Sequence, residues 1–117
     1  MSNFQPAEFT CNHCGKSHPT NPTPPEQVLE WLEIIRSEYG DKPVVVNSGY
    51  RCSVHNTNVG GARSSYHLKG QAVDFYIVGV DPATAFRFAD ELIGDAGGVG
   101  KYANFTHIDN RGHKARW

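Results

Sequence analysis

The interpretation of this chain rests on the stretch Ser65-Tyr66-His67-Leu68-Lys69-Gly70-Gln71-Ala72-Val73-Asp74, which places a histidine and a carboxylate on either side of a turn. Gly70 permits the turn, and the segment Gln71 to Ile77 alternates in the way that predicts a strand. Period two puts Asp74 on one face of that strand, opposite an apolar face made of Val73, Phe75 and Ile77. The stretch therefore predicts a strand that holds a carboxylate rigidly near a histidine.

A second histidine lies far downstream, in the segment Asn104-Phe105-Thr106-His107-Ile108-Asp109. Period two places Phe105, His107 and Asp109 on one face of the strand expected there. Two neutral imidazoles and one carboxylate make a three-ligand catalytic zinc site, with the fourth position open for water. His67, Asp74 and His107 are therefore candidate zinc ligands. The alternative is that His67 is only a turn residue and Asp74 a solvated charge.

Length and charge limit the possible functions. The chain has 117 residues, which suits one domain with a modest core, and its formal net charge is -1. No strong basic block is present, which argues against a nucleic-acid binder. No apolar run is long enough to span a membrane, and the N-terminus lacks a signal-peptide pattern. We therefore expect a monomer that is cytoplasmic as synthesised and needs separate release to reach a target outside the membrane.

The three cysteines are an odd number, so a complete disulfide framework is not implied. Cys11 and Cys14 form a C-x-x-C pair, and together with Cys52 and His18, or His13, they would suffice for a second, structural zinc site. The competing interpretation is a set of reduced thiols, with Cys52 packed inside as a small hydrophobic residue. A zinc count per chain distinguishes the two.

We divide the chain into an irregular segment, residues 1–24, in which Phe4 and Phe9 are expected to anchor to the core, and one domain, residues 25–117. Two helices are predicted: one begins with Pro25 at its first helical position, after Thr23 or Pro24, and ends at Gly40, and the other is capped by Asp81 and ends at Gly94. The predicted strands are Pro43–Asn47, Gln71–Ile77, Lys101–Tyr102 and Asn104–Asn110. We also expect a helical turn over Val54–Val59, a bend at Gly60–Ala62, and a glycine-rich turn over Gly97–Gly100.

Arg51 follows the first predicted strand, at a position where sites are commonly built. An arginine near a metal binds a substrate carboxylate or steadies a developing oxyanion. The alternative is an arginine that pairs with a surface acid.

Three ordered motifs resemble one known family: Ser48-Gly49-Tyr50-Arg51, Ser65-x-His67-x-x-Gly70-x-Ala72-x-Asp74 and Phe105-x-His107-x-Asp109. Together they resemble the zinc D-alanyl-D-alanine carboxypeptidases, the M15 peptidases, and most of all the short single-domain branch found in bacteria and phage lysins. The resemblance implies an α+β fold, a small antiparallel sheet with helices packed on one side, similar to the hedgehog signalling domain. It also implies one catalytic zinc on His67, Asp74 and His107, and peptidoglycan stem peptides as substrates.

One position departs from the family pattern. Several members carry a carboxylate as general base three residues before the last histidine ligand, where this chain has Asn104. Asp109 lies two residues from His107 on the same strand face, and we assign it as the base or as the group that orients water. The alternative is that Asp109 orients the imidazole of His107.

The sequence thus predicts hydrolysis by zinc-activated water in the manner of a D-alanyl-D-alanine carboxypeptidase, with Arg51 at the oxyanion or the terminal carboxylate. Ser65 and Tyr50 are expected to add hydrogen bonds to the substrate. Two alternatives stay open: an endolysin-like peptidoglycan endopeptidase, which cuts L-Ala–D-Glu bonds or crosslinks with the same ligands, and a non-catalytic zinc-stabilised binding module. The binding module is kept as an alternative because Asn104 stands where several family members have the catalytic carboxylate. The sequence does not reveal which bond is cut.

Overall fold

The protein is built on a single five-stranded sheet with the strand order β1-β2-β4-β3-β5. The computed structural model describes residues 4, 6–16, 18, 24–40, 42–60 and 65–117. Within them, the strands are β1 (Val44–Ser48), β2 (Ala72–Ile77), β3 (Gly98–Lys101), β4 (Thr106–Asp109) and β5 (Ala115–Arg116). The helices are α1 (Glu26–Glu38), α2 (Ser53–Asn58) and α3 (Pro82–Ile93), with 3-10 turns η1 (Pro6–Phe9) and η2 (Gly94–Ala96).

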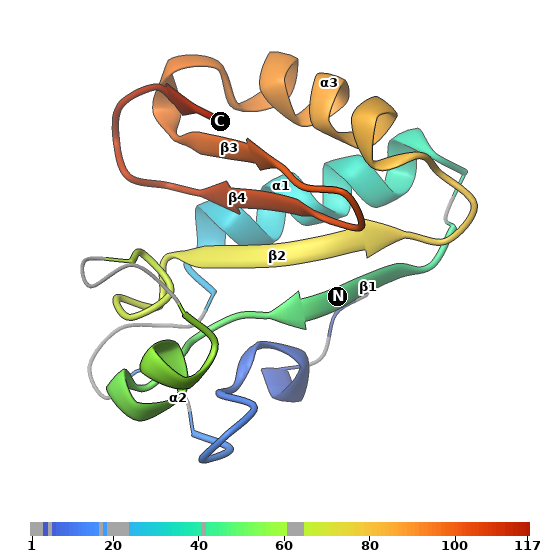
Figure 1. The fold of residues 1–117 in the computed structure, drawn as a ribbon. Coiled ribbons are helices and arrows are strands. Elements are labelled where there is room, and N and C mark those ends of the chain that lie inside the picture. Colours follow the sequence, from blue (N-terminus) through green and yellow to red (C-terminus); the bar gives the residue numbers. More distant parts are fainter. Residues whose placement is uncertain (1–3, 5, 17, 19–23, 41, 61–64) are drawn as a thin grey trace.

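Helices α1 and α3 pack against one another and against the sheet; in Figure 1, α1 lies behind β2 and β4, and α3 runs along the top above β3. The apolar face of β2 meets them, so that Val73, Phe75 and Ile77 are buried in the same core as Leu32 and Ala89. Asp74 points to the opposite face of the sheet. The alternation of β2 therefore separates the core from the face that carries the polar residues, and the α+β architecture with helices on one side is as predicted.

Several predicted element ends are found in the structure. Asp81 caps α3 by accepting a hydrogen bond from the Ala83 amide, and Pro82 follows at the first helical position. Helix α1 begins one residue later than predicted, because Pro25 takes the extended conformation that precedes the first turn. Cys52 caps α2, and its Sγ accepts a hydrogen bond from the His55 amide. The predictions for Thr23 and for Gly61–Ala62 lie outside the described residues.

The prediction for the glycine run was wrong. Residues 98–100 are not a turn but most of strand β3, which pairs with β4 in antiparallel register. A Cβ on Gly98 would lie 2.6 Å from the Asp109 carboxylate, and one on Gly100 would lie 2.5 Å from the Trp117 indole. The two glycines therefore leave room for the Asp109 and Trp117 side chains. This close approach explains why β3 contains glycine, a residue that strands otherwise disfavour.

The C-terminal tail is also more ordered than its basic composition indicates. Ala115 and Arg116 form β5, which pairs in parallel with β3, so the sheet is mixed and not purely antiparallel as predicted. Arg116 binds the Asp90 carboxylate and donates to the Gly94 and Gly97 carbonyls. These contacts fix the end of the chain beside the polar face of the sheet.

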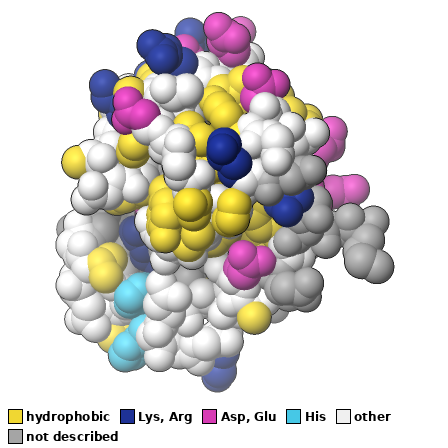
Figure 2. Space-filling view, turned by 90° about the vertical axis from the view of Figure 1, so that its right-hand side faces the viewer, with side chains coloured by type: hydrophobic (Ala, Val, Ile, Leu, Met, Phe, Trp, Pro, Cys, Tyr) yellow, Lys and Arg dark blue, Asp and Glu magenta, His cyan; other side chains and the backbone are white. Residues whose placement is uncertain are grey.

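The N-terminal segment packs onto the domain through the two predicted anchors, Phe4 and Phe9, which are both buried in the common core. It is not wholly irregular, because η1 forms one 3-10 turn against β1. The division of the chain at residue 24 stays a prediction. Figure 2 shows charged side chains around the upper part of one face and hydrophobic side chains near its centre. None of the helices in the described residues has the length and apolar character that crossing a bilayer requires.

Candidate metal centre

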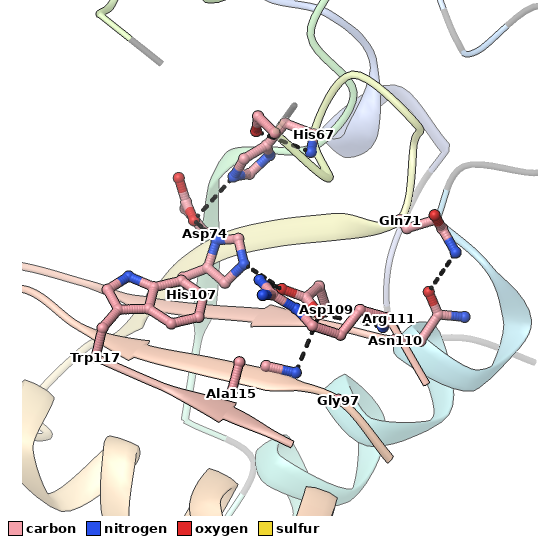
Figure 3. A network of polar contacts seen from close by, with 12 residues as sticks. His67, Gln71, Asp74, Gly97, His107, Asp109, Asn110, Arg111, Ala115 and Trp117 are labelled. Atoms are coloured by element: carbon pink, nitrogen blue, oxygen red, sulfur yellow. Dashed lines mark hydrogen bonds and ion pairs between the residues drawn. The ribbon is translucent and has the colours of Figure 1, made fainter. Parts of the chain in front are cut away.

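Strand pairing brings the three candidate ligands together. Asp74 on β2 lies directly opposite His107 on β4 in the antiparallel register. His67 comes from the turn before β2, where its carbonyl accepts a hydrogen bond from the Arg51 amide. One nitrogen from each histidine and one carboxylate oxygen all lie within 4.8 Å of one another, and all three residues are buried. Figure 3 shows His67 and His107 on either side of Asp74.

A hydrogen bond fixes the form of each ring. His67 Nδ1 lies 2.7 Å from the Gly49 carbonyl oxygen, which only accepts, so Nδ1 carries the proton. His107 Nε2 lies 2.7 Å from Asp109 Oδ2, so its proton is on Nε2 when the ring is neutral. The opposite nitrogens, His67 Nε2 and His107 Nδ1, then point lone pairs at one carboxylate oxygen, Asp74 Oδ1, at 3.1 and 2.9 Å.

This arrangement fits a bound cation. Lone pairs on three acceptors that face one another repel, and His67 Nε2 has no hydrogen-bond partner among the described residues although it is buried. Tetrahedral ligands at about 2.0–2.1 Å from zinc lie ~3.3 Å apart, close to the two observed separations. The Gly49 carbonyl and the Asp109 carboxylate serve as the outer partners that ligating histidines need. The residues present therefore match a metal centre with two imidazoles and one carboxylate.

The ionisation of the site follows from the same contacts. Burial raises the pKa of Asp74, but its contact with His107 and the charges of the two histidines outweigh burial and hold that pKa well below its ordinary range. Burial lowers the pKa of His107, whereas its bonds to Asp109 and Asp74 raise it by more. Because a ligating imidazole nitrogen must be deprotonated, a metal at this site competes with a proton on His107.

Asp109 is held from several directions behind His107 and is fully buried. Its Oδ1 accepts from the Gly98 amide at 3.0 Å and from Arg111 Nε at 2.8 Å, and its Oδ2 accepts from Arg111 Nη2 at 2.7 Å. Burial raises the pKa of Asp109, but the hydrogen bonds from Arg111 and His107 hold it well below its ordinary range. Figure 3 shows Asp109 and Arg111 on the side of His107 away from Asp74.

Arg51 pairs with a buried acid and not with a surface one. Its Nη2 lies 3.1 Å from Asp74 Oδ2, and its other two nitrogens donate to Ser48 and Asn56. A bulge between Val46 and Ser48 shifts the β1 register so that Ser48 lies opposite Asp74. The guanidinium therefore holds the outer oxygen of Asp74 and leaves Oδ1 to the histidines.

A cavity of about 480 Å³ opens over the three ligands. Tyr102 and Phe105 stack on one another at its rim with ring centroids 4.4 Å apart, and the Trp117 ring lies 4.9 Å from the His107 ring. The described residues that line the cavity are Arg51, Val59, Gly60, Ser65, Tyr66, His67, Asp74, Tyr102, Phe105, His107, Arg111 and Trp117. The cavity therefore combines cationic, aromatic and metal-ligating groups.

The predicted site residues do not all reach this cavity. Ser65 lines it, although its hydroxyl accepts a hydrogen bond from the His67 amide. Tyr50 is not among the lining residues, and its ring packs edge-on against His18. Asn104 is exposed and does not line the cavity either.

The tail supplies two cavity residues that were not among the predicted site residues, Arg111 and Trp117. The Arg111 guanidinium stacks over the Tyr66 ring at 4.4 Å and over the Trp117 ring at 5.0 Å while it binds Asp109. The alternation His107-x-Asp109-x-Arg111 was a usable signal for Arg111. Nothing local indicated that Trp117 lies over His107, because β5 pairs with β3 only in the folded sheet.

Comparison with known families agrees with this geometry. Residues 2–109 match the family described as Peptidase M15. The chain belongs to this family. The M15 match covers all three candidate metal ligands, and it accords with the mixed helix-and-sheet fold described above.

Named M15-like relatives include two kinds of peptidase. The chain is 44% identical over 75 residues to the peptidoglycan L,D-endopeptidase MepK of Escherichia coli. That alignment covers 58% of this chain and 40% of the relative. It is 48% identical over 48 residues to the zinc D-Ala-D-Ala carboxypeptidase of Streptomyces albus G. That alignment covers 40% of this chain and 19% of the relative. A probable peptidoglycan L,D-endopeptidase MepK of Haemophilus influenzae is 40% identical over 73 residues, 56% of this chain and 38% of the relative. The chain thus matches less than half the length of each of these relatives.

Proposed function

We propose that this M15 family member is a zinc peptidase that hydrolyses peptide bonds in the stem peptides of bacterial peptidoglycan. The observation that carries the proposal is the convergence of His67 Nε2, His107 Nδ1 and Asp74 Oδ1 at the floor of an open cavity. The names of the relatives, one a zinc carboxypeptidase and others peptidoglycan endopeptidases, supply the metal and the substrate class.

The three ligating residues would hold zinc with one position open toward the cavity. When bound there, zinc supplies a Lewis acid that polarises a peptide carbonyl and acidifies water. The protein contributes the rigidity of this site: the Gly49 carbonyl orients His67, and Arg51 orients Asp74. Each ligand is thereby held in one direction before the substrate arrives, which reduces the reorganisation that the reaction requires.

Arg51 is placed to act on the substrate as well. Its Nη1 donates one hydrogen bond to Asn56 and its Nη2 donates one to Asp74, and each of these nitrogens carries a second N–H. Because Arg51 lines the cavity beside Asp74, these donors are available to a terminal carboxylate of the substrate or to the oxyanion that forms during hydrolysis. If Arg51 binds the terminal carboxylate, the site favours cleavage next to a free carboxyl terminus, as in a D-alanyl-D-alanine carboxypeptidase.

For Asp109 we propose the orienting role and not the role of general base. A base must reach the water that it deprotonates, whereas Asp109 is fully buried behind His107 and bound to Arg111. Its low pKa also makes it a poor proton acceptor. Its hydrogen bond to Nε2 instead keeps the Nδ1 lone pair of His107 directed at the metal position.

A second candidate function is cleavage of an L,D-peptide bond inside the peptidoglycan. The longer aligned stretch with the L,D-endopeptidases favours it. The aromatic rim of Tyr102, Phe105 and Trp117 is a surface against which an extended peptide can lie on both sides of the bond that is cut.

Mass spectrometry of the products tests the proposal. Zinc-loaded protein is incubated with intact peptidoglycan and with a soluble pentapeptide stem that ends in D-Ala-D-Ala, alongside chelator-treated protein and His67→Ala. Loss of one terminal alanine identifies a carboxypeptidase, and a split stem or an opened crosslink identifies an endopeptidase. Zinc-loaded protein that releases no product from either substrate would refute the peptidase and leave the zinc-stabilised binding module.

A further inference from the structure

Three cysteine sulfurs from two distant segments meet outside the cavity. The Sγ atoms of Cys11, Cys14 and Cys52 all lie within 4.8 Å of one another, and all three thiols are free. Cys11 Sγ and Cys52 Sγ are 3.6 Å apart. Sulfurs bound tetrahedrally to zinc at about 2.3 Å lie ~3.8 Å apart. The separation therefore matches two ligands of one metal ion.

Backbone N–H groups surround these sulfurs. The Cys52 amide donates to Cys11 Sγ at 3.4 Å, and the His55 amide donates to Cys52 Sγ at 3.4 Å. The amides of Cys14 and His13 also lie near Cys11. Burial raises the pKa of Cys11, but these amide donors outweigh burial and lower it to about 7. At Cys11 these donors favour the thiolate, which is the form that binds metals. The Lys16 amide lowers the pKa of Cys14, but burial and the neighbouring Cys11 raise it by more, so Cys14 would give up its proton when a metal binds.

The backbone around the C-x-x-C pair is closed into a tight loop. The Gly15 amide donates to the Cys11 carbonyl at 2.8 Å, and the Cys11 amide donates to the Lys16 carbonyl at 2.9 Å. Gly15 has a φ of 71°, which a residue with a side chain adopts only with strain. This loop directs Cys11 and Cys14 to the same side, toward Cys52.

His55 is the residue best placed to complete the set. It follows Cys52 by three residues on the first turn of α2, so Cys52-x-x-His55 forms a second ligand pair on one helix face. Its ring stacks on that of His13 with centroids 6.3 Å apart. The imidazole of His55 lies outside the 4.8 Å group, so the proposal requires its side chain to turn toward the sulfurs when a metal binds. Histidine side chains gather at the surface in Figure 2, at the height of α2 and the N-terminal segment in Figure 1.

We propose that Cys11, Cys14, Cys52 and His55 form a structural zinc site separate from the candidate metal centre. Three cysteines and one histidine are a common ligand set of closed, tetrahedral zinc sites. Binding would replace the thiol protons, so no oxidant is needed. A disulfide between Cys11 and Cys52 is the competing arrangement, but it would leave Cys14 and the surrounding amides without a role.

The site would fix the loop that serves the cavity. Cys52 directly follows Arg51, and the Tyr50 amide donates to the Phe9 carbonyl two residues before Cys11. A metal that joins Cys11 to Cys52 therefore clamps the N-terminal segment to the loop that carries Arg51 and the Gly49 carbonyl. We expect its loss to loosen the outer partners of the catalytic ligands without removing those ligands.

Metal content separates the two sites. Protein purified with zinc under reducing conditions should contain about two zinc ions per chain, and His67→Ala and Cys14→Ser about one each. Cys14 is exposed, so its replacement by serine leaves the core intact. His113→Ala, an exposed histidine outside both groups, is the matched control and should keep both ions. Because these counts do not depend on turnover, they test the second site even if the peptidase proposal fails.

Cobalt substitution identifies the ligands. Cobalt-loaded His67→Ala should show the sulfur-to-cobalt charge-transfer absorption of a thiolate site, and Cys14→Ser should lose most of it. In the His67→Ala background, His55→Ala should weaken cobalt binding at least about tenfold, since loss of even an outer partner of a ligand costs that much, whereas His13→Ala should leave it unchanged. A zinc content near one that Cys14→Ser does not alter, or a Cys11–Cys52 disulfide in the freshly purified protein, would overturn the proposal. An unchanged affinity in His55→Ala would overturn the assignment of the fourth ligand.

Discussion

The orienting role of Asp109 makes a prediction that a general base does not share. In Asp109→Asn, the remaining side-chain oxygen is needed by the Gly98 and Arg111 amides, which now bind Oδ1 at 3.0 and 3.1 Å. The new NH₂ group must then face His107 Nε2. Because both groups would be donors, the His107 proton moves to Nδ1, and the ring no longer presents a lone pair to the metal.

The size of the effect follows from these contacts. Loss of the outer partner of a ligating histidine weakens metal binding about 10–100-fold, which corresponds to ~1.4–2.8 kcal/mol. The substitution also breaks a buried ion pair, since Asp109 is fully buried and the Arg111 side chain is 16% exposed. We expect the loss of this ion pair to lower the free energy of unfolding by about 3 kcal/mol, which is the lower end of the range for breaking a buried ion pair.

Zinc affinity is measured by competition with a chelating dye, turnover by release of alanine or peptide at saturating zinc, and stability by urea unfolding. Asn110→Ala is the matched control, because Asn110 is the neighbouring residue and its side chain bonds to Gln71 outside this network. Arg111→Lys keeps the charge but loses the two-pronged contact with Asp109, so it should lower zinc affinity in the same direction by a smaller factor.

The outcome that refutes this reasoning is specific. If Asp109→Asn binds zinc within about threefold of the wild-type protein while kcat falls a hundredfold or more, Asp109 acts on a proton during the reaction. The base assignment made from the sequence would then stand, and the contacts of Asp109 would describe a resting state that changes when substrate binds.

Four further predictions concern other parts of the molecule. Arg51→Lys should lower kcat/KM about 100-fold on a stem peptide with a free carboxyl terminus, and the loss should shrink on an amidated peptide if the guanidinium binds that carboxylate. Gly98→Ala should lower the free energy of unfolding by about 3 kcal/mol because its Cβ meets the buried carboxylate–guanidinium pair. Gly100→Ala should cost only about 1 kcal/mol, since the Trp117 indole can move toward solvent, but it should raise KM, measured on the same peptides. Leu32→Ala should lower the stability measured by urea unfolding by about 3 kcal/mol and leave zinc content unchanged, because Leu32 lies in the core behind the sheet.

The sequence by itself named the three candidate metal ligands that the fold brings together. His67, Asp74 and His107 could be named because strand alternation and one turn are local properties that a pattern of side chains reports directly. The same holds for the cap and the end of α3, which depend on residues next to one another in the chain. Local conformation and face are therefore predictable here, and they were sufficient to propose a metal site.

Only the tertiary structure decided what surrounds those ligands. The environment of Asp109 depends on Arg111 and on the close approach of Gly98, which the pairing of β3 with β4 creates. The position of Trp117 over His107 depends on the parallel pairing of β5, and the meeting of Cys11 with Cys52 depends on how the N-terminal segment packs on β1. Strand register and long-range packing arise from the free energy of the whole core, and no short stretch of sequence encodes them.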